Sequence, residues 1–139
     1  MSIVQTQTTS FKSQLYQGIH DLTTDVIKIA LYTGNASLNA DTTVYSTSNE
    51  IVATGYTAGG KVMTGITVST SGYTAYVNFS NVIWNPGAFT ARCALIYNSS
   101  KGDKSVAVLD FGSDKTTTSS FTITMPANTA TAALIRSSN

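Results

Sequence analysis

Charged residues are scarce in this sequence. Asp, Glu, Lys and Arg make up 11% of its 139 residues, and 8 cations against 7 anions give a net charge of +1 at pH 7. Soluble domains have about 25% charged residues, so uncharged side chains must supply much of the polar surface here. A nucleic-acid binder concentrates Lys and Arg, whereas only Lys101 and Lys104 lie close together, around Gly102 and Asp103 in a predicted hairpin tip. We therefore predict no nucleic-acid partner.

The residue types that catalysis and metal binding use most are also scarce. His20 and Cys93 are the only histidine and cysteine, which are too few for a zinc site and allow no internal disulfide. Cys93 lies in the apolar run 91–97, so we expect a buried thiol. His20 stands beside Asp21 just past a predicted helix, an ordinary structural position. We predict no catalytic residue, no cofactor and no metal site, although calcium held by loop carbonyls would leave no sequence signature.

The 7 acidic residues are spread over separate predicted loops, and no pair typical of a glycosidase stands out. Asp110 differs from the other acids, because strand alternation places it on the face shared by Val106 and Val108. A carboxylate there is partly buried and needs a partner. We expect a structural hydrogen bond or ion pair with Arg92.

Two short strings match parts of phosphate- and magnesium-binding motifs. Residues 55–61 (GYTAGGK) fit the first part of a P-loop, but Val62 replaces the required Ser or Thr, and a strand pattern follows where a helix is needed. Residues 110–112 (DFG) copy the magnesium-binding tripeptide of protein kinases without the other kinase elements. We interpret the first string as a glycine-rich turn and the second as a strand end, with Gly112 turning the chain into residues 113–115.

Signals for secretion and membrane insertion are missing as well. Residues 1–9 have neither a basic start nor an apolar core typical of a signal peptide, and no apolar run approaches membrane-spanning length. We expect synthesis in the cytoplasm and no membrane partner. The Asn-x-Ser strings at Asn35, Asn78 and Asn98 are then interpreted as chance matches to the glycosylation pattern.

What the sequence does contain is β-strand pattern. Thr is β-branched and suits a pleated surface, while Ser and Asn favour turns. One short helix is predicted from Ser10, as N-cap, with Phe11, Leu15 and Ile19 at helical spacing. Residues 26–33 alternate as a strong strand, with Ile27, Ile29 and Leu31 on one face and Lys28, Ala30 and Tyr32 on the other.

Further strands are separated by turn formers. We predict hairpins of 61–69 with 73–79 across 70–72, and of 89–97 with 105–111 across 98–104; a long connection over 34–49 with a helical turn near 46–51; a tight turn at 84–87; and strands at 121–125 and 132–136.

This succession predicts an all-β fold: an antiparallel β-sandwich or jelly-roll-like single domain over residues 10–139, with a short N-terminal helix. Residues 1–9 form an extended arm, which gains order when something pairs with it.

Three segments together resemble small virion structural proteins of tailed bacteriophages. They are 24–33 (TDVIKIALYT), 55–60 (GYTAGG), and 91–97 (ARCALIY) running through 103–111 (DKSVAVLDF), within a resemblance that extends from about Phe11 to Pro126. The resemblance implies a non-enzymatic virion component, and the size suits a capsid decoration (cement) protein. Such proteins typically form homotrimers and stabilise the head by binding the shell between major capsid proteins. The implied location is the capsid surface.

The contacts expected of such a protein are hydrophobic and aromatic. The uncharged arm could pair with a neighbour's sheet edge, and Tyr16, Tyr45, Tyr56 and Tyr73 could anchor contacts or belong to the core. The alternative is a receptor- or glycan-binding tail or baseplate module, in which Trp84 and the tyrosines stack on sugar faces. A Trp beside a proline turn more often fills a core.

Overall fold

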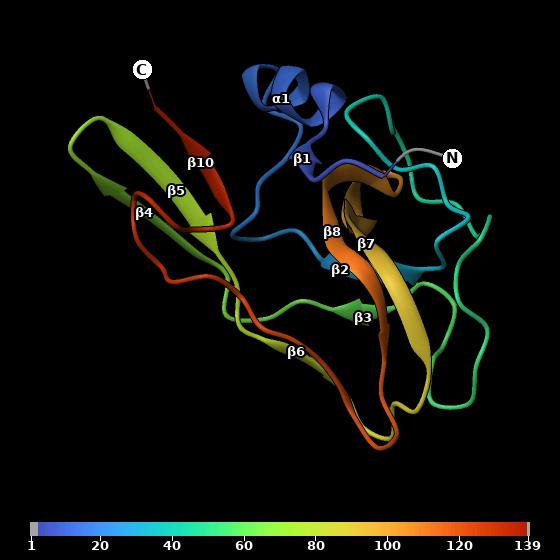
Figure 1. The fold of residues 1–139 in the computed structure, drawn as a ribbon. Helices are drawn as coiled ribbons and strands as arrows, with labels where there is room; N and C mark the ends of the chain where they lie inside the picture. The colour runs from blue at the N-terminus through green and yellow to red at the C-terminus, as the bar shows by residue number, and fades with distance from the viewer. Residues whose placement is uncertain (1–2, 139) are drawn as a thin grey trace.

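Three antiparallel sheets and one short α-helix make up the computed structural model, which describes residues 3–138 (Figure 1). This confirms the predicted all-β class with its N-terminal helix. The elements are β1 (Thr6–Gln7), α1 (Thr9–Tyr16), β2 (Ile27–Tyr32), β3 (Lys61–Val62), β4 (Thr67–Ser71), β5 (Thr74–Asn78), β6 (Val82–Trp84), β7 (Thr90–Asn98), η1 (Ser99–Lys101), β8 (Lys104–Thr116), β9 (Phe121–Ile123) and β10 (Ile135–Ser137).

The largest sheet has five strands in the order β1-β8-β7-β2-β3. Its centre is the β7–β8 hairpin, and β2 pairs with β7 without a register break, from Ile27 opposite Asn98 to Tyr32 opposite Cys93. The predicted alternation of β2 is correct, since Ile27, Ile29 and Leu31 belong to one buried cluster and Ala30 and Tyr32 to another. Both faces of this strand are therefore covered.

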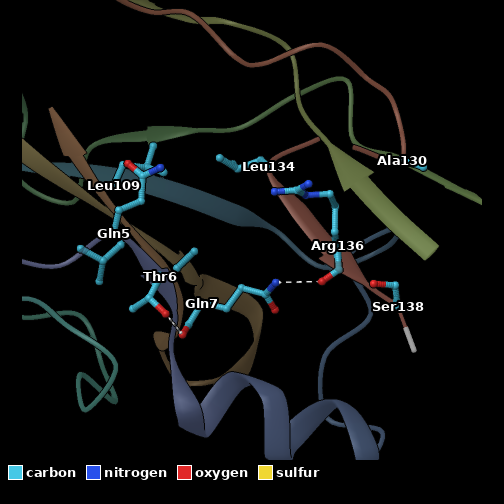
Figure 2. Close-up of a pocket in the computed structure, with 10 residues that line it drawn as sticks. Gln5, Thr6, Gln7, Leu109, Ala130, Leu134, Arg136 and Ser138 are labelled. Atoms are coloured by element: carbon cyan, nitrogen blue, oxygen red, sulfur yellow. Dashed lines mark hydrogen bonds between the residues drawn. The ribbon is translucent and has the colours of Figure 1, made fainter. Parts of the chain in front are cut away.

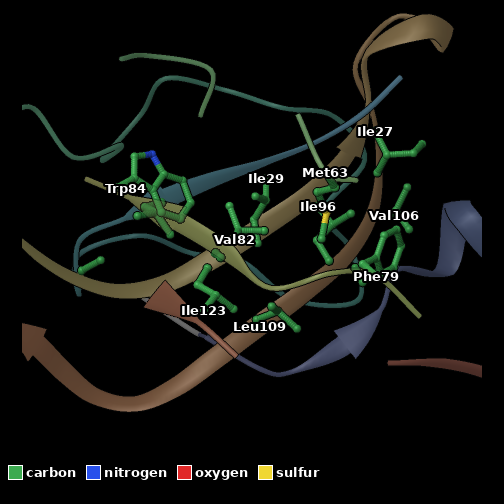
Figure 3. Close-up of a cluster of buried hydrophobic side chains, with 14 of the residues drawn as sticks. Ile27, Ile29, Met63, Phe79, Val82, Trp84, Ile96, Val106, Leu109 and Ile123 are labelled. Atoms are coloured by element: carbon green, nitrogen blue, oxygen red, sulfur yellow. The ribbon is translucent and has the colours of Figure 1, made fainter. Parts of the chain in front are cut away.

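The main core lies between the five-stranded sheet and the two-stranded β6–β9 sheet. Figure 3 shows Val82 and Ile123 of the small sheet beside Ile29, Ile96 and Leu109 of the large one. Burying each such side chain contributes about 1.5–3 kcal/mol, and the two layers together form the hydrophobic interior of a sandwich. Aromatic rings close one end of this core: Tyr56, Trp84, Phe89 and Phe121.

Strand β8 contains two irregularities that alter the predicted faces. Val106 is an extra residue between the pairs Tyr97–Ser105 and Ile96–Ala107, so it joins the main core, whereas Val108 joins the opposite cluster. The prediction that these two valines share a face was wrong, because a bulge shifts the alternation by one residue. The strand also continues to Thr116, so the DFG string is not a strand end; Gly112 instead adopts φ +84° in a second bulge.

Helix α1 begins two residues earlier than predicted and is shorter. Its N-cap is Thr8, not Ser10: the Thr8 hydroxyl accepts a hydrogen bond from the Phe11 backbone N–H at 3.3 Å. Thr8 is fully buried, and the Ser105 hydroxyl donates to its oxygen at 2.9 Å. A contact across 97 residues therefore selects the cap, while Ile19 lies beyond the helix.

The predicted strand over 61–69 is two strands. Lys61–Val62 pairs with β2, whereas Thr67–Ser71 pairs with β5 in a hairpin whose turn is Gly72-Tyr73. Gly65, at φ +63°, lies in the break between them. No helical turn forms near 46–51, because Asn49 adopts φ +63° and Glu50 bridges to Tyr32 of β2 instead.

The N-terminal arm pairs within its own chain. Thr6 and Gln7 lie opposite Val108 and Ala107 of β8, and Ile3 forms a parallel bridge with Leu38. Met1 and Ser2, the first residues of the predicted arm, lie outside the described residues. The arm therefore already covers the edge of β8 at Ala107 and Val108.

Candidate functional site

A three-stranded sheet, β10-β5-β4, stands apart from the larger sheet and is called the side sheet here. Figure 1 shows it projecting at the left of the molecule, with α1 near β10. Neither β4 nor β5 contains a charged residue, and Tyr73 at the tip of their hairpin is 91% exposed. Strands β4 and β5 thus present an uncharged, partly apolar surface to solvent, whereas β10 carries the exposed Arg136.

A cleft of about 420 Å³ separates α1 from the side sheet and is called the helix cleft. Its walls include Leu15, which is 41% exposed, and Val68, which is 51% exposed. Tyr16 is 93% exposed beside them. The full lining is Gln7, Phe11, Lys12, Leu15, Tyr16, Leu22, Val68, Ala75, Tyr76, Val77, Ile135, Arg136 and Ser137.

A second cleft, of about 410 Å³, lies between β1 and β10 (Figure 2). It is more polar, with Gln5, Gln7 and Arg136 among its lining residues. One hydrogen bond spans it, from the Gln7 side-chain amide to the Arg136 carbonyl oxygen at 3.2 Å. This second cleft and the helix cleft share Gln7 and Arg136, so they lie side by side along β10.

The four tyrosines expected at contacts have different environments. Tyr16 and Tyr73 are exposed, but Tyr56 is buried at 9% exposure and Tyr45 is half-buried. Of the two alternatives, contact or core, Tyr45 and Tyr56 take the second: both pack on the buried clusters, and both hydroxyls donate hydrogen bonds to Glu50, at 2.6 and 2.5 Å. These two side chains fasten the 44–60 segment and are not available to a partner.

Glu50 is a buried carboxylate that the sequence reasoning did not single out. Besides the two tyrosines, it accepts a hydrogen bond from the Gly59 backbone N–H at 2.8 Å, and it is only 7% exposed. Burial and the bond to Glu50 raise the pKa of Tyr56 well above its usual value, and the same two causes raise the pKa of Tyr45. The only available sequence signal was its isolation, since no other acid occurs between Asp41 and Asp103.

The glycine-rich string ends in β3, as expected of a turn between strands. Gly59 donates its N–H to Glu50, and the Gly59 carbonyl accepts from the Tyr97 hydroxyl at 2.6 Å. A Cβ on Gly60 would lie 1.8 Å from the Ile29 carbonyl oxygen. The glycines therefore permit close packing of the turn on β2, and the Gly59 N–H, which a P-loop would offer to a phosphate, already donates to Glu50.

His20 lies in a hydrogen-bonded cluster at the tip of the β7–β8 hairpin. The Asn98 amide donates to His20 Nδ1 at 2.9 Å, so Nε2 carries the proton and donates to Gln14 Oε1 at 2.7 Å. The same amide donates to Asp25 at 2.8 Å. Burial lowers the pKa of His20, although Asp25 opposes the shift. The arrangement positions the helix-following loop on the hairpin.

The two neighbouring lysines are both used within the chain. Lys101 forms an ion pair with Asp25 at 3.3 Å, and the Lys104 ammonium donates to the Lys101 carbonyl at 3.1 Å. This places them in a hairpin tip, as predicted.

The remaining candidates lie where the sequence placed them. Arg92 forms an ion pair with Asp110, the predicted structural partner. Cys93 is fully buried, which raises the pKa of its thiol to about 12. Trp84 is 1% exposed in the core, so stacking on a sugar is closed to it. Asn78 and Asn98, in two of the glycosylation-like strings, are buried as well.

Among residues 3–138, no three His, Cys, Asp or Glu side chains gather as a metal site would require. No helix in that part of the chain is long and apolar enough to cross a membrane. No protein-family model, curated protein or solved structure matches this chain. The two clefts and the exposed tyrosines are therefore the features from which a function is argued.

Proposed function

We propose that this chain is a non-enzymatic structural protein of a tailed-phage virion, a capsid decoration protein that binds the shell between major capsid proteins as a homotrimer. The resemblance of its three segments to phage virion proteins suggests the class. The proposal places the chain on the capsid surface, after synthesis in the host cytoplasm.

The observation that carries the proposal is the exposure of large side chains on α1 and the side sheet. Tyr16 on α1 and Tyr73 on the side sheet are 93% and 91% exposed, and Leu15 and Val68 are close to half exposed. Tyrosine is enriched at protein interfaces, because its ring buries much area at a small entropic cost. Such a surface suits contact with other proteins.

Low charge supports the same function. A net charge of +1 on 139 residues gives little electrostatic repulsion between copies. Copies packed closely on a shell gain from that, since like-charged neighbours would otherwise oppose assembly.

Cryo-EM of purified particles of the encoding phage tests the proposal, with a gene-deletion particle as the control. We expect density for this chain at threefold positions of the capsid, absent from the deletion particle. Density at the tail tip would instead favour the alternative, a receptor- or glycan-binding module, and absence of the chain from particles would refute a virion role.

Light scattering on the purified chain gives a second test. A trimer in solution or on shells agrees with the proposal. A chain that stays monomeric and never binds shells would contradict it.

A further inference from the structure

The helix cleft combines an apolar interior with cations at its margin. Its floor is formed by the buried side chains Phe11, Leu22 and Ile135, and its walls by apolar side chains of α1 and the side sheet. Lys12 and Arg136 belong to the same lining and are exposed, but the Arg136 guanidinium donates a hydrogen bond to the Thr131 carbonyl, outside the cleft. The cleft is therefore amphipathic, with one sign of charge.

Neither cation is neutralised by a residue that the structure describes. The ion pairs among residues 3–138 are Arg92 with Asp110 and Lys101 with Asp25, and no carboxylate lines the helix cleft. An apolar segment that carries carboxylates would satisfy both the walls and the margin. One that carries Lys or Arg would meet like charge, which disfavours it.

The size of the cleft limits what can enter it. About 420 Å³ holds a few side chains, not a folded surface. An occupant must therefore be a helical or extended segment that inserts apolar anchors, as in other groove-binding complexes.

We propose that the helix cleft receives a segment of the major capsid protein that carries apolar anchors and at least one carboxylate. This inference rests on the proposed decoration function and assigns it a contact site. Leu15 and Tyr16 pack against the anchors, while Lys12 pairs with the carboxylate.

Binding to gene-deletion particles, measured by co-sedimentation over a concentration series, tests this site. The double variant Leu15→Ser/Tyr16→Ser should bind at least about tenfold more weakly than the wild type. Large exposed side chains that become buried on binding carry much of an interface's affinity. The matched control is Val52→Ser, which removes an apolar side chain that is 98% exposed and lies outside the cleft. Its binding should equal that of the wild type.

The charges are tested separately with Lys12→Glu, which is exposed and should leave the fold intact. This variant should bind severalfold more weakly than the wild type at low salt, and its binding should depend less on salt concentration than wild-type binding does. Lys115→Gln removes an exposed cation outside this cleft and should change neither property.

The outcomes separate the two proposals. Wild-type binding with undiminished binding by Leu15→Ser/Tyr16→Ser overturns the cleft assignment and leaves the decoration function standing. Equal weakening by Val52→Ser, or loss of trimers from the double variant instead of loss of shell binding, also overturns the assignment. An unaltered Lys12→Glu variant overturns its charge component. Failure of the wild type to bind any deletion particle overturns the decoration function together with the cleft proposal.

Discussion

Replacing Glu50 with alanine should lower the free energy of unfolding by about 3 kcal/mol. The carboxylate accepts three hydrogen bonds, from the Tyr45 and Tyr56 hydroxyls and the Gly59 N–H. Loss of a hydrogen bond to a charged group lowers the free energy of unfolding by about 1.5–3 kcal/mol when the other partner is left buried without a bond. Tyr45 is half-buried and water can replace its bond, so two donors dominate the loss.

The effect is large for a domain of this size, since small domains are stable by only about 5–15 kcal/mol. It corresponds to a fall in Tm of roughly 10 °C. Trp84 is the only tryptophan and lies 6.1 Å from the Tyr56 ring, so its fluorescence in a urea or thermal titration reports the transition.

Two further variants make the Glu50 prediction specific. Asp41→Ala removes an exposed carboxylate and should change stability by less than about 0.5 kcal/mol. A double-mutant cycle of Glu50→Gln with Tyr56→Phe should show coupling of at least about 1 kcal/mol. Stability of Glu50→Ala within about 1 kcal/mol of the wild type would refute the reasoning that the buried donors depend on this carboxylate.

Three other predictions follow from buried or confined groups. Stability should fall as the pH drops below 6.5, because burial lowers the pKa of folded His20 and the unfolded chain therefore takes up the proton first. The His20→Gln variant should lose this dependence between about pH 7 and 5.5. An unchanged slope of stability against pH, measured by urea titration, would contradict the prediction. The Cys93 thiol, with a pKa of about 12, should react with a disulfide reagent at pH 8 only when the chain unfolds, and rapid native labelling would show it is accessible. Gly60→Ala should lower the free energy of unfolding by more than about 3 kcal/mol or prevent folding, because its Cβ would collide with the Ile29 carbonyl. Gly72→Ala, with φ +58° but open space around the Cβ, should lower it by about 1 kcal/mol. Equal Tm values for the two variants would refute the close-packing argument.

Local pattern was enough to predict the parts of the fold whose partners are near in sequence. The β7–β8 hairpin and the two faces of β2 follow from alternating side chains and from the turn formers between them. The buried Cys93 follows from the apolar run around it, and the Arg92–Asp110 pair follows from the need of a partly buried carboxylate for a partner. These features depend on a period of two and on short connections, both of which are visible in the sequence.

Bulges limited that approach within β8. The extra residue Val106 moves one valine to the other face, and Gly112 lets the strand continue where a turn was expected. Neither valine nor glycine marks a bulge by itself, because a bulge depends on how β8 pairs with its neighbouring strand.

The sequence by itself determined that the chain is an all-β domain with few charges and a core of alternating apolar strands. Tertiary structure decided the helix cap at Thr8, the burial of Tyr56 against Glu50, and the cleft between α1 and the side sheet. The Thr8 contact with Ser105 spans 97 residues, and the bond from Tyr97 to Gly59 spans 38. Which polar groups meet at such separations depends on how the layers pack, and a pattern read over a few neighbouring residues does not contain that information.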